Sequence, residues 1–130
     1  MNDLEYLQAH VPEFCGYADE EARHQTDRRI RAIVGSALAD ALTRLGDRLS
    51  TDASAAVEAL IFRCEFPDQR YVTELDHRKL DDEELATVAR IDRALVEQAE
   101  SVTSAGATEL AALVDEIDKE LDRRDDLVPA

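Results

Sequence analysis

Glycine and proline are scarce in this chain: 130 residues contain four glycines and three prolines. These two residue types mark most turns and are the least compatible with a helix interior, so their scarcity leaves room for few turns. Apolar residues recur every three or four positions along most of the chain, which is the period of a helix with one buried face. The sequence therefore predicts an all-α fold.

Four long segments carry an apolar stripe, by which we mean apolar residues spaced to lie along one side of a helix. The segments are 18–48, the stretch between Ser50 and Pro67, 81–106, and 108 to about 124. Representative stripe residues are Ile30, Val34, Leu38 and Leu45; Val57, Leu60 and Cys64; Val88, Ile91 and Leu95; and Leu110, Ile117 and Leu121. Each stripe needs a partner surface, so we expect the four helices to pack together.

Helix ends can be located from capping residues. Ser50, Thr51 and Asp52 are three adjacent candidates to cap the second long helix, and Asp81 with Glu84 has the spacing of a capping box for the third. Gly106 is expected to end that helix and Thr108 to begin the last one. Residues 3–10 predict a short helix capped by Asp3. Residues 68–80 favour another short helix, with an extended segment over 70–73 as the alternative.

The whole chain is expected to form one domain over residues 1–130, with 1–16 as an N-terminal arm and 125–130 as a frayed tail. Its predicted architecture is an elongated all-α bundle of four to five amphipathic helices with short connections. Because elongated bundles often complete their core by association, we expect a homodimer.

The charge balance excludes some partners. Fifteen lysines and arginines stand against thirty acidic residues, which gives a formal net charge of −15. Nucleic acid backbones and anionic membranes would repel such a chain, so we expect neither direct nucleic acid binding nor membrane binding. There is no apolar run of roughly 20 residues, and the first fifteen residues contain acids but no lysine or arginine. We therefore expect a cytoplasmic protein.

One stretch of the long segment 18–48 breaks the apolar pattern. Towards its N-terminus, the stripe of Val34 and Leu38 is continued by charged residues only: Glu20, Arg23, Asp27 and Arg31. This end either overhangs the core into solvent or forms a polar cluster between helices. The second alternative is the more informative, because buried charges must be paired or bind something.

Two Glu-x-x-His pairs offer candidate metal ligands. They are Glu21 with His24, and Glu74 with His77. On a helix this spacing places a carboxylate and an imidazole one turn apart, as in di-iron and di-manganese carboxylate bundles. If the two pairs converge, they could hold iron, manganese or zinc. The sequence provides no further glutamate on the inner faces of the other helices, so the main expectation is no cofactor.

The sequence contains no coherent catalytic set, and we name no catalytic residue. The function it favours is that of a small acidic bundle acting through protein–protein contacts or homo-oligomerisation. Phe62 points away from the stripe of its helix and is a candidate interface residue; the alternative is that the N-terminal arm covers it. Most of the excess negative charge lies on residues 81–130, so an acidic decoy of a nucleic-acid-binding protein is a further alternative.

Overall fold

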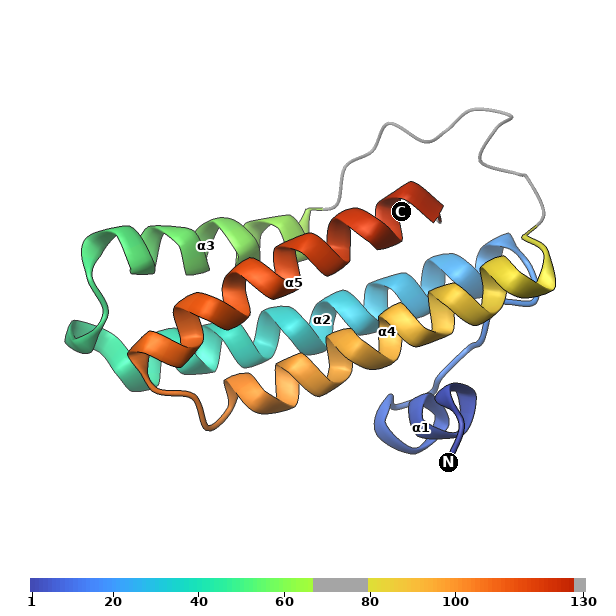
Figure 1. Cartoon of the computed structure of the whole chain (residues 1–130), viewed down its shortest axis with the longest axis horizontal. Helices are drawn as coiled ribbons and strands as arrows, with labels where there is room; N and C mark the ends of the chain where they lie inside the picture. The colour runs from blue at the N-terminus through green and yellow to red at the C-terminus, as the bar shows by residue number, and fades with distance from the viewer. Residues whose placement is uncertain (67–79, 128–130) are drawn as a thin grey trace.

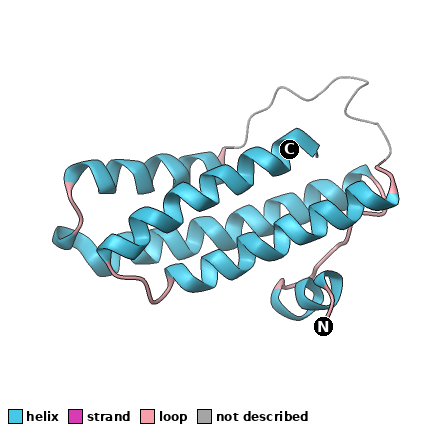
Figure 2. Ribbon diagram, viewed as in Figure 1, coloured by secondary structure: helices cyan, strands magenta, loops and turns pink. Residues whose placement is uncertain are grey.

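A computed structural model of the chain describes residues 1–66 and 80–127. Within these ranges the fold is all-α, as predicted (Figures 1 and 2). The five α-helices are α1 (Asp3–His10), α2 (Glu20–Leu45), α3 (Thr51–Glu65), α4 (Asp82–Val102) and α5 (Ala107–Leu127), and a 3-10 turn, η1 (Gly46–Arg48), follows α2.

The helices α2 to α5 form an elongated bundle in which each contacts two others (Figure 1). Helix α2 packs against α3 and α4, while α5 packs against α4 and, along a shorter seam, against α3. The fully buried side chains along the bundle come from the predicted stripes, among them Ile30, Val34, Leu38, Leu95, Leu110, Ile117 and Leu121. Burial of these apolar side chains is the main driving force for the fold.

The N-terminal arm lies on the outside of α4. Tyr6 and Leu7 of α1 are buried there, and the Arg93 guanidinium of α4 lies 4.6 Å from the centre of the Tyr6 ring. Arg93 also forms an ion pair with Asp3 at 3.3 Å. A cation over a tyrosine face is attracted by the ring, so these contacts hold α1 in a fixed position.

Capping residues account for most helix ends. Ser50 accepts a hydrogen bond from the Ala53 backbone N–H, and Asp81 with Glu84 forms the predicted capping box. The turn at Gly46 uses a positive φ of 48°, a conformation that favours glycine, and α2 therefore ends at Leu45, short of the expected residue 48.

Several predicted boundaries were wrong. Asn2, one residue before Asp3, caps α1. Helix α4 ends at Val102 rather than at Gly106, and α5 begins at Ala107, before the expected cap Thr108. Helix α5 also continues to Leu127, so residues 125–127 do not belong to a frayed tail.

Helices α2 and α3 approach closely at Gly35. A Cβ atom placed on Gly35 would lie 3.3 Å from the Cβ of Cys64, which is tighter than ordinary van der Waals contact. A glycine here therefore lets the two helix backbones come together. No helix in the described part of the chain is long and apolar enough to cross a membrane.

Candidate functional site

A network of buried charged side chains crosses the bundle in the half that contains the C-terminus. Its centre is Arg124 of α5, which is fully buried. Arg124 Nε donates a hydrogen bond to Asp92 Oδ1 at 2.7 Å, and Arg124 Nη1 donates to Asp27 Oδ1 at 2.6 Å. Because Asp27 lies on α2 and Asp92 on α4, one guanidinium joins three helices.

A second buried arginine, Arg31 of α2, extends the network. Its Nε donates to both carboxylate oxygens of Asp27, at 2.9 and 3.1 Å, and its Nη2 donates to Asp125 of α5 at 2.5 Å. Asp27 is therefore shared by two guanidinium groups. Charge-assisted hydrogen bonds of this kind are short and stronger than neutral ones.

The network reaches the surface through Arg63 of α3. Arg63 Nη2 donates to Asp125 at 3.1 Å and to Asp122 at 2.8 Å, and Nη1 donates to Asp118 at 2.7 Å. Partial burial is the largest single effect on the pKa of Arg63, and it lowers that pKa. The hydrogen bonds to the three aspartates together outweigh it and raise the pKa. The residue remains a cation and ties the end of α3 to α5.

Tyr17, in the link before α2, completes the network on the side of the N-terminal arm. Its hydroxyl donates to Asp92 Oδ2 at 2.5 Å. Burial raises the pKa of Tyr17 above its usual value of 10, and the negative charge of Asp92 raises it further. The phenol therefore stays protonated and acts as a hydrogen-bond donor.

Apart from Asp118 and Asp122, whose side chains are 54 % and 65 % exposed, the network is balanced in charge. Three aspartates, at positions 27, 92 and 125, face three arginines, at positions 31, 63 and 124. Every one of these six groups has a partner on another helix. Because the charged groups satisfy one another's hydrogen bonds, the network is suited to a structural role. It fixes which helices pack together and in what register.

Of the two alternatives for the charged stretch of α2, the structure shows the polar cluster between helices. Arg23, Asp27 and Arg31 are all buried, while Glu20 is half-buried at the start of the helix. Solvent overhang is therefore wrong for this part of α2. Of the four candidates, Asp27 and Arg31 belong to the network, whereas the guanidinium of Arg23 does not.

Sequence reasoning missed the partners on the other helices. Asp92 lies between Val88 and Leu95 on the inner face of α4, and Arg124 follows Ile117 and Leu121 at helical spacing on α5. A charged residue that continues an apolar stripe was recognised on α2 only. The same signal was available at these two positions.

The metal hypothesis has no support in the described part of the chain. No group of three or more His, Cys, Asp or Glu side chains suited to a metal ion occurs within residues 1–66 and 80–127. Glu21 is exposed and His24 half-buried on the first turns of α2. Glu74 and His77 lie outside the described residues, as do residues 68–79 of the short helix expected at 68–80, so the convergence of the two pairs stays a prediction.

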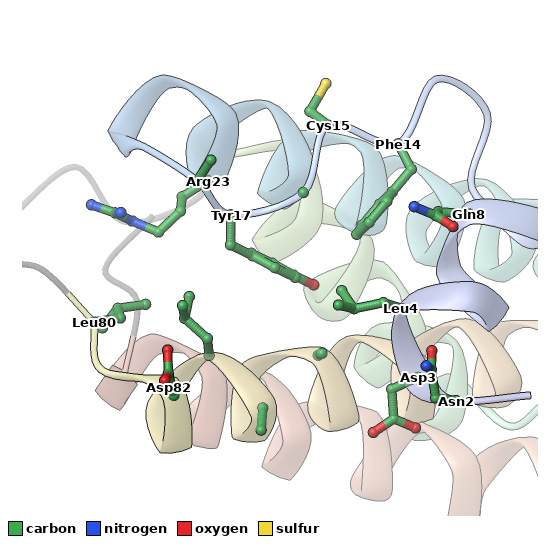
Figure 3. A pocket seen from close by; sticks show the side chains of 15 residues that line it. Asn2, Asp3, Leu4, Gln8, Phe14, Cys15, Tyr17, Arg23, Leu80 and Asp82 are labelled. Carbon is green, nitrogen blue, oxygen red and sulfur yellow. The ribbon is translucent and has the colours of Figure 1, made fainter.

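Next to the network is a pocket with a volume of about 840 Å³, between the N-terminal arm and the start of α4. Figure 3 shows Arg23 and Leu80 at one end of it and Leu4 at the other, with the Tyr17 ring between them. Pockets that hold small ligands have volumes of roughly 300–1,000 Å³. This pocket is the second candidate site.

Comparisons of the chain with protein-family models, with curated protein sequences and with solved structures found no match. The geometry and chemistry of the described residues therefore carry the functional interpretation.

Replacing Tyr17 with phenylalanine is expected to lower the free energy of unfolding by about 1–3 kcal/mol at pH 7, because a buried hydrogen bond to a charged group is lost. The pKa of Tyr17 is higher in the folded state, so this contribution is fully present below pH 10 and declines above it. The difference in free energy of unfolding between the unmodified protein and the Tyr17→Phe variant should thus shrink above pH 10, by up to about 1.4 kcal/mol per pH unit. Urea unfolding between pH 7 and 11 measures it.

Tyr6→Phe is the matched control at pH 7. The Tyr6 hydroxyl is buried and forms no hydrogen bond with any residue in the described ranges. Its removal should leave stability unchanged or slightly raised. Equal losses in the two variants at pH 7 would contradict the role assigned to the Tyr17 hydroxyl.

Proposed function

We propose that this protein acts through protein–protein contacts, without catalysis, and forms a homodimer through the outer surface of α3. The observation that carries the proposal is a pair of exposed phenylalanines. Phe62 and Phe66 are each 62 % exposed, and their ring centres lie 4.9 Å apart. Phe62 is the interface candidate from the sequence, and its neighbour one helical turn away enlarges the apolar surface.

Exposed aromatic rings are costly unless something covers them. Within the described residues, only four large hydrophobic side chains are exposed: Met1, Leu4, Phe62 and Phe66. Two of these four form a single patch at the end of α3. Aromatic residues are enriched at the energetically dominant positions of interfaces, and a twofold dimer would bring two identical patches together.

The patch lies on a well-anchored part of the bundle. Arg63, next to Phe62, is held by carboxylates of Asp118, Asp122 and Asp125 on α5. A surface that is already ordered loses less conformational entropy on association. This anchoring supports the end of α3 as a binding surface.

The acidic decoy is a weaker alternative. A decoy needs carboxylates that are available to a basic partner, and several on α5 are engaged by cations of the same chain. Asp118 and Asp122 are paired with Arg63, Asp115 with Lys119, and Glu120 with Arg123. These pairs support the homodimer over the decoy.

Sedimentation equilibrium tests the proposal. We expect the unmodified chain to dimerise at micromolar concentration, and the double variant Phe62→Ser/Phe66→Ser to dissociate at least thirtyfold more readily. A loss of about 2 kcal/mol is typical for residues that dominate an interface, and it corresponds to about thirtyfold. Both side chains are exposed, so the melting temperature of the monomer should change little.

Leu4→Ser is the matched control, because Leu4 is an exposed apolar residue on a different helix. It should leave the dimer unchanged. A chain that is monomeric at 100 μM, as an order of magnitude for weak association, would overturn the proposal. Unchanged association of the double variant would do the same.

A further inference from the structure

The pocket beside the N-terminal arm has a mixed lining, with apolar side chains along it and polar ones, such as Gln8 near Leu4, at its ends (Figure 3). Leu4 of α1, Phe14 of the link, Leu80, and Leu85 and Ala89 of α4 line it. Its volume of about 840 Å³ is large enough for a small organic molecule. Such a lining favours a ligand with an apolar body.

One end of the pocket carries an unusual arginine. Arg23 is 9 % exposed, yet its guanidinium forms no hydrogen bond or ion pair with any residue in the described ranges. The other two arginines buried on this side of the bundle, Arg31 and Arg124, are each held by two aspartates. The Arg23 nitrogens are not among the buried atoms that lack a partner, so they remain accessible from the pocket. An accessible guanidinium that no carboxylate of the described residues holds can bind an anionic group.

Two acidic residues also line the pocket and limit how much negative charge a ligand can carry. Asp3, near Leu4 at the far end, is paired with Arg93. Asp82 begins α4 on the same side as Arg23 in Figure 3, but no ion pair joins these two side chains. A carboxylate at the same end of the pocket would repel a group of high negative charge, such as a phosphate dianion, more than a single carboxylate.

We infer that this pocket binds a small monocarboxylate with an apolar body, such as a medium-chain fatty acid. The carboxylate lies at the Arg23 end, where a guanidinium can donate two parallel hydrogen bonds to it. The chain packs along Tyr17 towards Leu4 (Figure 3). Leu85 and Ala89 of α4 also belong to the lining. This inference does not depend on the homodimer, because α3 contributes no residue to the pocket.

Isothermal titration calorimetry with octanoate tests the inference, with 1-octanol as a neutral probe of the same chain length. Octanoate should bind the unmodified protein at least tenfold more tightly than octanol does. Arg23→Gln should weaken octanoate about tenfold and leave octanol unchanged. Arg28→Gln is the matched control, since Arg28 is exposed on the same helix and does not line the pocket.

A second variant keeps the test decisive if Arg23→Gln is poorly folded. Ala86 is exposed and lines the pocket, so Ala86→Trp should fill it and abolish binding of both probes while the helix persists. Equal affinity for octanoate and octanol, or equal loss of octanoate binding in the Arg23 and Arg28 variants, would overturn the inference. Octanoate binding that survives Ala86→Trp would also overturn it.

Discussion

Arg124→Ala is expected to lower the free energy of unfolding by about 3–5 kcal/mol, the cost typical of breaking a buried ion pair from one side. The guanidinium of Arg124 is the only described partner that joins Asp27 to Asp92. Without it, Asp92 keeps only the hydroxyl of Tyr17, and a fully buried carboxylate is left with no cation. For a domain of this size, such a loss is a large part of the total stability.

Urea unfolding followed by far-UV circular dichroism measures this loss, and Arg123→Ala is the matched control. Arg123 is the preceding residue on the same helix, but its side chain is 60 % exposed, whereas that of Arg124 is fully buried. Its replacement should cost less than about 1 kcal/mol. If both variants lose the same amount, the buried network does not stabilise the bundle as described.

Ending the chain after Arg123 is expected to have a still larger effect, at least that of Arg124→Ala. This truncation removes both Arg124 and Asp125, so Asp27 and Asp92 lose one cation while Arg31 loses its second carboxylate. The last turn of α5 disappears as well, and with it the contact of Leu127 with the core. We expect a chain that retains helix but lacks a cooperative thermal transition.

Ending the chain after Leu127 is the control for this experiment. That chain keeps every described contact of the network, and it should melt cooperatively. Calorimetry compares the two truncated chains directly. If the chain ending at Arg123 melts like the longer one, the end of α5 has no structural importance and the frayed tail expected from the sequence is the better description.

The sequence was sufficient to predict the helices because the required signals are local. Asp81 and Glu84, for example, form a capping box within four residues. Errors occurred where two local signals compete. Gly106 and Thr108 both suit a helix boundary, and the structure starts α5 between them, at Ala107.

The buried network could not be predicted from one helix at a time. Asp27 and Arg31 on α2 are equally compatible with a solvent overhang and with a buried cluster, and the difference depends on what α4 and α5 place opposite them. Asp92 and Arg124 settle the matter, since each interrupts an inner face at the matching level of the bundle. Examining all stripes together for charges of opposite sign would have indicated the pairing.

The ion pairs of the network also have a consequence for how long the folded state persists. They connect residues 97 positions apart in the case of Asp27 and Arg124, and 94 apart in the case of Arg31 and Asp125. Closing such long loops costs entropy, so these contacts are expected to form late, after local helices and neighbouring pairs. Interactions absent from the folding transition state mainly slow unfolding. The network therefore acts on the lifetime of the native chain and little on the speed with which it folds.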